Sequence, residues 1–525
     1  MQRPRDPSRH ATLAIWCSVL GVLLVALVAS VPGSPLQPVL PDGVVPTGPF
    51  AWLARAVGLD RLDGAALAIA GVIAVTAAAA SFLVVLRAAW QGRVSVRSVL
   101  VLTVAYHVVV LTLPLLFSRD VYSYAFYGRI AGIHGANPYV ATPADFPGDP
   151  LFHLVGPKWL DTPAVYGPLF TGASALLSRW IGSVEALVAT FRVLAVAASL
   201  GAVAAIYATS RRAWPLRSAF AVAAFGLNPV VLFQSAASGH NDLWVALGIA
   251  AGLWLLLGGR ELAAVAVLAL ATLVKATAAL PLLVLLVWCV ARRPAGERLR
   301  ASFTRAGLAA AIGLVVASPF LQLHDPTLGM SELAGHEGWL APSRFVRRLL
   351  DALSGDALGI VTRLTFAALL VVSVVLLLRA VWRLAPRGGR PADADVVEVG
   401  AAWGWSLLLL MLLGPVLLPW YVVWALPLAW LLPRVPRAVL ITVSSALAVS
   451  QWAAEPSRFP GAYDVNVLVG HYAITPVVIG ALVWLLVDGR RRLRAGAAFA
   501  DRQGDEPAAG RDERDDRRAG AAGER

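Results

Sequence analysis

The 525-residue sequence has little charge and few of the residues that mark redox, zinc or nucleotide chemistry. Asp, Glu, Lys and Arg make up only 14% of it, and lysine occurs only at Lys158 and Lys275. The two cysteines, Cys17 and Cys289, fall inside apolar stretches, so no extracellular disulfide is expected. The sequence has no P-loop glycine pattern, zinc-ligand spacing or Gly-x-Ser-x-Gly motif. These absences disfavour an energy-coupled ATPase and a metalloprotease.

Apolar residues dominate the sequence. They make up 58% of the chain, and its mean hydropathy is +0.71. Several stretches approach the roughly 20 apolar residues that cross a bilayer core, which predicts spanning helices. Examples are 11–31, 65–86, 99–117 and 358–378. The first is too long for a signal-peptide core and lacks a convincing cleavage site, so it is expected to remain as a helix. The predicted fold is an all-α polytopic membrane protein of roughly 12–14 transmembrane helices.

The net charge of +13 comes from arginines gathered in short segments between apolar runs. This pattern is typical of cytoplasmic loops in the plasma membrane and argues against a nucleic-acid partner. The predicted cytoplasmic segments include 87–97, 211–217, 292–305, 379–390, 434–437 and 490–494. Three regions follow: an N-terminal transmembrane hairpin at 1–97, a larger transmembrane domain at 98–487, and a charged, disordered cytoplasmic tail at 488–525.

The same alternation places a long loop, 118–165, on the extracytoplasmic side as a cap. It begins Ser-Arg-Asp-Val-Tyr-Ser-Tyr, so that Arg119, Asp120 and Tyr122 stand at a helix end. A neighbouring arginine would keep the Asp120 carboxylate ionised, which suits a general base. An interfacial salt bridge within an aromatic belt explains these residues equally well. A loop of this length, rich in aromatic and charged residues, favours a functional cap.

Two further groups are candidates for the same site. His240, Asn241 and Asp242 lie consecutively between two apolar helices, where polar side chains are costly unless they face a cavity or ligand. Capping of the following helix would explain Asn241 or Asp242 but not His240. Lys275 interrupts an apolar run and predicts two short helices meeting near the outer face. Its ammonium either reaches the interface or pairs with an anion.

Other polar residues of the predicted external segments are weaker candidates. Asp145 and Asp149 stand beside Pro147 and Gly148 and are expected to be turn residues. Residues that could line the site, but are equally consistent with ordinary loop or belt chemistry, are His324, Asp325, His336, Glu337, Trp339, Trp420, Tyr421 and His471.

At these positions the sequence resembles the GT-C glycosyltransferases, and most closely the actinobacterial polyprenol-phosphate-mannose-dependent α-1,6-mannosyltransferases of lipoglycan synthesis. The resemblance rests on the Ser-Arg-Asp-Val-Tyr-Ser-Tyr motif and on four others along the chain. These are Gly135-Ala136-Asn137-Pro138-Tyr139, Val165-Tyr166-Gly167-Pro168-Leu169, Asn228-Pro229 and Gly239-His240-Asn241-Asp242, followed by Lys275.

The resemblance implies a GT-C-like transmembrane catalytic domain in which the first large external loop supplies a catalytic acidic side chain, here Asp120, acting as a base. It implies a polyprenyl-phosphate sugar donor, with a glycolipid or polysaccharide acceptor and membrane lipids as further partners. No cofactor is expected, and the expected reaction requires no metal. The expected reaction inverts the anomeric carbon, with Lys275, Arg129 and His240 as cations for the leaving phosphate. The remaining expected substrate-binding residues are Arg119, Tyr122, Asn137, Tyr139, Trp159, Asp161, Tyr166, Asn241 and Asp242.

Two other classes of function fit parts of the same pattern. A transporter or flippase of lipid-linked sugars would use these residues to bind and translocate its cargo. It predicts broken helices with charges near the bilayer midplane in both halves, whereas these polar residues concentrate at one face and no internal repeat is evident. A noncatalytic scaffold of cell-wall assembly would tolerate the loss of the Asp120 carboxylate.

Overall fold

The computed structural model describes residues 7–321, 328–330, 337–338, 340–354, 358–386, 391–454 and 458–488. Within these ranges the chain folds into helices joined by turns, with no strand assigned. The α-helices are α1 (Pro7–Ala29), α2 (Pro49–Ala56), α3 (Gly64–Trp90), α4 (Val96–Thr112), α5 (Asp120–Gly132), α6 (Pro168–Trp180), α7 (Val184–Ala213), α8 (Ser218–Gly226), α9 (Asp242–Leu257), α10 (Glu261–Thr272), α11 (Ala279–Ala291), α12 (Arg298–Ala317), α13 (Pro342–Ser354), α14 (Gly359–Leu384), α15 (Asp393–Leu413), α16 (Arg434–Ala448) and α17 (Pro460–Val469).

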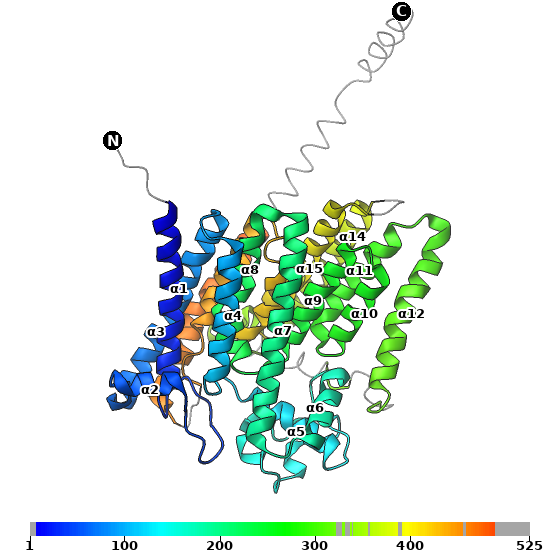
Figure 1. Ribbon diagram of the computed structural model, residues 1–525. Helices are drawn as coiled ribbons and strands as arrows, with labels where there is room; N and C mark the ends of the chain where they lie inside the picture. The colour runs from blue at the N-terminus through cyan, green and yellow to red at the C-terminus, as the bar shows by residue number, and fades with distance from the viewer. Residues whose placement is uncertain are drawn as a thin grey trace, which may run out of the picture.

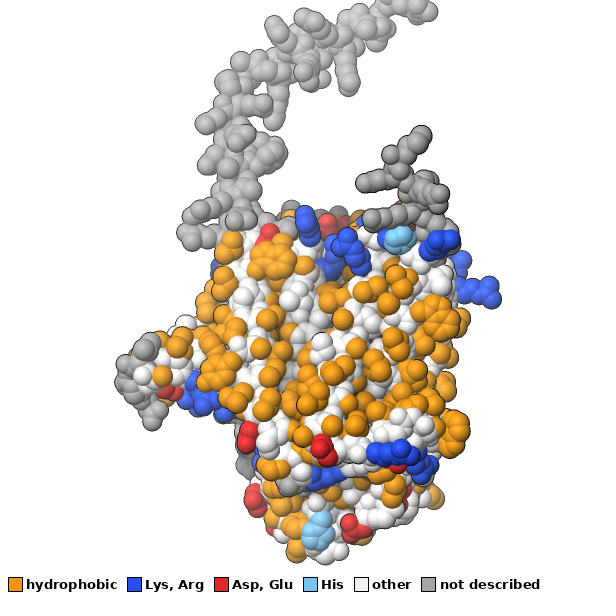
Figure 2. Space-filling model, turned by 90° about the vertical axis from the view of Figure 1, so that its left-hand side faces the viewer, with side chains coloured by type: hydrophobic (Ala, Val, Ile, Leu, Met, Phe, Trp, Pro, Cys, Tyr) orange, Lys and Arg blue, Asp and Glu red, His pale blue; other side chains and the backbone are white. Residues whose placement is uncertain are grey.

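Most of the long helices stand side by side in one bundle (Figure 1). Among the described residues, eight helices are long and apolar enough to cross a membrane, and four apolar helices are shorter. The shorter four are Val96–Thr112, Asp242–Leu257, Glu261–Thr272 and Ala276–Ala291. Hydrophobic side chains cover the middle of the face seen in Figure 2, with charged side chains above and below them. The protein is therefore an all-α, multi-pass membrane protein, as its hydropathy predicts.

Arginine-bearing segments distant in sequence meet at one end of the bundle, which we call the arginine end. The guanidinium carbons of Arg217 and Arg437 lie 3.5 Å and 4.1 Å from the centre of the Trp90 ring. Arg212 is ion-paired with Asp393 at 2.6 Å. Because these residues lie at or near the ends of α3, α7, α8, α15 and α16, the alternation predicted from charge matches the arrangement of the helices.

The opposite end is covered by α5, α6 and the turns between them, which form a cap below the bundle in Figure 1. The backbones of helices α5 and α6 are in direct contact at Gly128, which is possible because glycine has no side chain. A Cβ built there would lie 2.4 Å from the carbonyl oxygen of Ser174. The cap lies where the sequence places its long external loop.

Helices α10 and α11 form a short hairpin that breaks at Lys275, as the sequence predicts. They contain 12 and 13 residues, so each is about 18 to 20 Å long, well short of a 30 Å hydrocarbon core. Lys275 has extended backbone angles and a 3-10 turn follows it at Ala276–Ala278. The ammonium therefore sits at the tip of a hairpin recessed within the bundle.

Of the predicted tail at 488–525, residues 489–525 lie outside the described residues. The boundaries at 97/98 and 487/488 remain predictions. Helices α1 and α3, which lie in the predicted N-terminal region, pack along each other and are joined through α2.

Candidate active site

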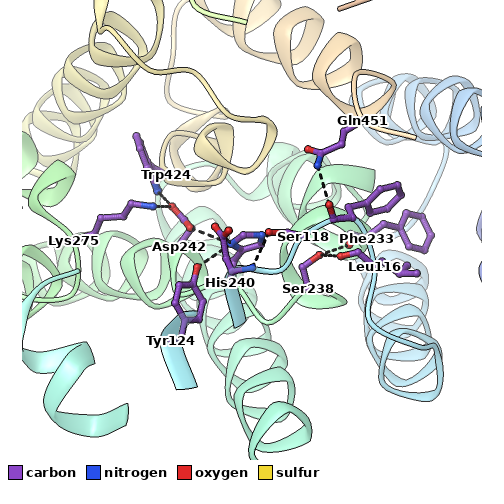
Figure 3. A network of polar contacts seen from close by, with 12 residues as sticks. Leu116, Ser118, Tyr124, Phe233, Ser238, His240, Asp242, Lys275, Trp424 and Gln451 are labelled. Atoms are coloured by element: carbon purple, nitrogen blue, oxygen red, sulfur yellow. Dashed lines mark hydrogen bonds and ion pairs between the residues drawn. The ribbon is translucent and has the colours of Figure 1, made fainter. Parts of the chain in front are cut away.

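A cluster of polar side chains from three segments surrounds His240 (Figure 3). Its Nδ1 atom lies 3.7 Å from Oδ2 of Asp120 and 3.9 Å from Oδ2 of Asp242. The Tyr124 hydroxyl is within hydrogen-bond distance of the same nitrogen, at 3.0 Å. The ring of Trp420 stacks on the imidazole with centroids 4.1 Å apart. The structure thus brings together Asp120, His240 and Asp242, which the sequence proposes from separate motifs.

Lys275 joins this cluster through a buried ion pair. Its Nζ atom lies 2.8 Å from Oδ1 of Asp242, and the Trp424 indole donates to the same oxygen at 2.6 Å. The ammonium also lies 4.7 Å from the centre of the Tyr421 ring and 5.3 Å from that of Trp424. An ammonium surrounded by a carboxylate and two aromatic faces is stabilised by charge pairing and cation–π attraction. Of the two outcomes open from sequence, Lys275 pairs with an anion.

The position of Asp120 depends on a constrained backbone just before α5. Phe117 has φ of +58°, which is costly for a bulky side chain and is held by its neighbours. Its N–H donates to the Leu36 carbonyl at 2.9 Å, and its own carbonyl accepts from the Gln451 amide at 2.8 Å (Figure 3). Ser118 Oγ then accepts the Asp120 N–H at 3.1 Å. The first turn of α5 is thereby fixed, with the Asp120 carboxylate at its positively polarised N-terminus.

The turn that carries Lys275 is held by the chain as it leaves the cap. The N–H of Gly167 donates to the Val274 carbonyl and that of Leu169 to the Leu273 carbonyl, both at 3.0 Å. A Cβ on Gly167 would lie only 2.1 Å from the Leu273 carbonyl oxygen. The Tyr-Gly-Pro motif therefore serves as a backbone-to-backbone contact between the cap and the Lys275 hairpin, which explains why glycine stands there.

The protein surroundings shift the pKa values of Asp120 and His240, which face one another. Burial raises the pKa of Asp120 to about 6, against the opposing attraction of Lys275 and, more weakly, Lys158. The side chain still keeps 23% of its surface exposed, so a substrate can reach it. Burial, with a smaller effect from Lys275, lowers the pKa of His240 well below its ordinary value. This direction favours a neutral imidazole, whereas the sequence-based prediction makes His240 a cation.

Several buried polar atoms of the cluster have no hydrogen-bond partner within the described ranges. They are Nε2 of His240, both side-chain polar atoms of Asn241, and Oδ2 of Asp242. Asn241 occupies the N-cap position of α9 but makes no side-chain cap bond, so capping does not explain it. Buried groups of this kind are normally satisfied, and their concentration here indicates a site for a polar ligand or water.

A pocket of ≈ 170 Å³ adjoins Lys275 and Tyr421. Apart from the ammonium, its walls are largely apolar. They are formed by Val165, Ala276, Thr277, Met330, Leu410, Gly414, Pro415, Val416 and Trp424. An apolar pocket with one cation at its edge suits an amphiphile with an anionic head.

Arg129 does not join the cluster. Its guanidinium pairs with Asp149, with Nε 2.8 Å from Oδ2, and His134 Nε2 lies 2.8 Å from the same oxygen. Although burial acts to raise it, the pKa of Asp149 is lowered by bonds from the Leu151 N–H, His134 and Arg129. Asp149 also accepts the Leu151 N–H as a turn residue would, so this set stabilises the cap.

Four of the aromatic and amide candidates likewise make structural contacts. The Tyr122 hydroxyl donates to the Val39 carbonyl at 3.0 Å. Asn137 donates to the Phe320 carbonyl and accepts the Tyr139 N–H. The Tyr139 hydroxyl donates to the Tyr166 carbonyl at 2.7 Å. Tyr166 itself packs edge-on against Tyr124, with centroids 4.8 Å apart, and so lies directly behind the cluster.

The other candidates lie at the edge of the site, away from it, or outside the described ranges. Arg119 precedes Asp120 as the N-cap of α5, Asp161 is exposed on the cap, and Trp159 lies under the Lys158 ammonium at 4.8 Å. Glu337 is bound by Arg347 and Arg363, at 2.8 and 3.0 Å. His471 contacts Arg348. His324, Asp325, His336 and Trp339 lie outside the described residues.

Sequence reasoning missed three members of the site. Tyr124 is visible in the motif around Asp120 and stands one helical turn after it, on the same face. Lys158 acts on Asp120 electrostatically and was signalled only by the rarity of lysine. Trp424 had no local signal, because it lies 182 residues from the carboxylate that it contacts.

Comparison with known proteins assigns a family to this arrangement. Residues 15–292 match the family model described as alpha-(1->6)-mannopyranosyltransferase, N-terminal domain. The chain is 30% identical to alpha-(1->6)-mannopyranosyltransferase A of Mycobacterium tuberculosis, over 62% of this chain and 63% of that protein. It is 31% identical to the protein of the same name from Corynebacterium glutamicum, over 33% of this chain and 36% of that one. The chain thus aligns with less than two thirds of the length of either relative.

Proposed function

Because the chain belongs to the alpha-(1->6)-mannopyranosyltransferase family, we propose that it is a membrane glycosyltransferase acting at the outer face of the plasma membrane. It transfers mannose from polyprenyl-phosphate-mannose to a lipid-linked glycan or lipoglycan. The observation that carries this proposal is the meeting of Asp120 with the Lys275 cluster around His240. The reaction requires a base and a positive charge for the leaving phosphate. A carboxylate with a raised pKa suits the first role, and a cation beside an apolar pocket suits the second.

In the proposed reaction an acceptor hydroxyl oxygen attacks the anomeric carbon of mannose from the face opposite the phosphate. The bond between that carbon and the phosphate oxygen breaks, and its electron pair leaves with the polyprenyl phosphate. Asp120 accepts the hydroxyl proton as the new glycosidic bond forms, which gives inversion at the anomeric carbon. A pKa of about 6 leaves this carboxylate ionised at neutral pH yet more basic than an ordinary aspartate.

The donor is assigned to the pocket beside Lys275. Its apolar walls suit the first isoprene units, and the ammonium attracts the phosphate as negative charge develops on it. Asp242 and Trp424 hold the ammonium in place, so its charge is preorganised for the reaction. Lys158, which lies within electrostatic reach of Asp120, adds a second positive charge from the cap.

His240 takes a positioning role in place of the cationic one. Its neutral imidazole, stacked on Trp420 and close to the Tyr124 hydroxyl, stands between Asp120 and Asp242. A neutral ring at this place separates the two carboxylates without neutralising the base. Asn241, with both amide atoms buried and unpartnered in the described chain, supplies hydrogen bonds to the sugar.

Incubating the purified protein with radiolabelled polyprenyl-phosphate-mannose and a lipid-linked mannan acceptor tests this function. The expected result is label in a product that an α-1,6-specific mannosidase removes. Transport of the labelled lipid across a vesicle membrane, with no covalent product, would instead identify a transporter. Polyprenyl-phosphate-glucose serves as the donor control.

A further inference from the structure

A charged pocket lies at the arginine end, beside the ends of α10 and α11 that are farthest from Lys275. Its volume is ≈ 500 Å³. It is lined by Leu256, Gly258, Gly259, Glu261, Arg292, Arg293, Arg305 and Pro391. Glu261 is the first residue of α10 and Arg292 follows the last residue of α11. None of these residues belongs to the site around Asp120.

Positive charge exceeds negative charge in this pocket. Three guanidiniums converge on the single carboxylate of Glu261, with Arg292 at 3.5 Å, Arg293 at 3.4 Å and Arg305 in closer contact. Two acidic residues in the first turn of α15 make other contacts. Asp393 is ion-paired with Arg212, and Asp395 accepts the Ala392 N–H, although it still attracts Arg292 electrostatically.

Two of the three guanidiniums are poorly exposed to water, whereas the Arg293 side chain keeps 34% of its surface exposed. Arg292 is 4% exposed and Arg305 is 9% exposed, and Nε of Arg293 is buried with no partner in the described chain. Cations in such surroundings are costly unless an anion completes the site. Guanidiniums bind phosphate oxygens through paired N–H donors, and basic pockets between membrane helices at the cytoplasmic surface suit anionic lipid headgroups.

We propose that this pocket binds a phosphoryl group, carried either by an anionic phospholipid of the adjacent leaflet or by free phosphate. The bound group lies between α10, α11 and α12 and adds negative charge to a pocket whose lining carries three guanidiniums and one carboxylate. It thereby holds together the base of the hairpin whose tip presents Lys275. The proposal does not depend on the identity of the reaction at Asp120.

The test measures the thermal unfolding temperature of the full-length protein in detergent. Phosphatidylglycerol, phosphatidylcholine and inorganic phosphate are added separately. The expected result is a saturable rise of several degrees with phosphatidylglycerol or with inorganic phosphate, and none with phosphatidylcholine. A rise with phosphatidylglycerol alone identifies a lipid headgroup, and an equal rise with inorganic phosphate identifies the free ion.

Arg293→Gln should weaken the apparent affinity for the stabilising anion at least tenfold, because it removes one of the converging guanidiniums. Arg93→Gln is the matched control, since Arg93 is exposed at the arginine end and lines no part of the pocket. Should Arg293→Gln fail to fold, Pro391→Glu adds a repelling carboxylate at the rim, with Pro391→Gln as its neutral control. An equal loss in Arg93→Gln, or no anion-specific rise in the wild-type protein, would overturn the proposal.

Discussion

The Lys275 ammonium and the Asp242 carboxylate form a buried ion pair at 2.8 Å, across two helix ends that are 33 residues apart in sequence. The pair connects the tip of the α10–α11 hairpin to the first turn of α9. The pair also affects the pKa of Asp120, because Lys275 lowers that pKa and Asp242 raises it. The site is thus a network in which the proposed base and the proposed phosphate ligand are electrostatically coupled.

Replacing Asp120 with asparagine should lower the transfer rate by a factor of 10² or more, because the amide cannot accept the hydroxyl proton. The measurement is labelled-mannose transfer by purified protein at saturating donor. Asp60→Asn, on an exposed turn, is the control and should transfer at the wild-type rate. If Asp120→Asn retained more than a tenth of the wild-type activity, Asp120 would not be the base.

The stability of the same variant separates catalysis from folding. Burial raises the folded-state pKa of Asp120 from 3.8 to about 6, so the folded protein binds more protons than the unfolded chain between these values. Ionisation of Asp120 therefore opposes folding, and stability falls as pH rises through this window. Asp120→Asn should unfold at a temperature no lower than that of the wild type at pH 7, and should show a smaller decline between pH 4 and 6. A marked drop at pH 7 would indicate a structural role.

The pH dependence of the reaction follows from the same pKa. Above about pH 6 Asp120 is ionised and can accept a proton, and below it the carboxyl is protonated and inactive. The value of kcat/KM should fall about tenfold for each unit of pH below 6. Lys275→Arg keeps the nearby charge and should leave the midpoint close to 6. A profile that stays flat down to pH 4.5 would contradict the assignment.

Lys275→Met should destabilise the protein by about 3–5 kcal/mol, because it leaves the fully buried Asp242 carboxylate without its cation. The double variant Lys275→Met with Asp242→Asn should recover most of that stability. It should still show a raised KM for the polyprenyl-phosphate donor, since the ammonium is missing. Denaturant unfolding and donor titration measure the two effects separately. Recovery of donor affinity along with stability would mean that Lys275 serves only to pair with Asp242.

Gly167→Ala should separate the cap from the Lys275 turn. The added Cβ would meet the Leu273 carbonyl oxygen at 2.1 Å, and the backbone must shift to relieve the contact. We expect a lower unfolding temperature and a kcat reduced at least tenfold. Gly148→Ala is the control in the same loop, because a Cβ there meets nothing within 4 Å. Equal behaviour of the two variants would show that this contact does not position the site.

The sequence predicted those parts of the structure that depend on local pattern. The break at Lys275, the arginine end and the cap follow from hydropathy and charge, which act over one helix or one loop. Contacts between distant helices could not be obtained in this way. Nothing near Trp424 or Gln451 in sequence indicates that one bonds Asp242 and the other bonds the carbonyl of Phe117. Arg129 was predicted to be a site residue for the same reason. Nothing in its motif indicates that its guanidinium is paired with Asp149.

The shortness of α10 and α11 has a consequence for substrate delivery. Each of the two helices is about 18 to 20 Å long against a hydrocarbon core of roughly 30 Å, so the turn that joins them at Lys275 does not need to reach the far surface of the bilayer. A donor with a long hydrocarbon tail could slide sideways out of the bilayer into its pocket. Its tail would stay solvated by lipid throughout, and only the charged head would exchange one environment for another.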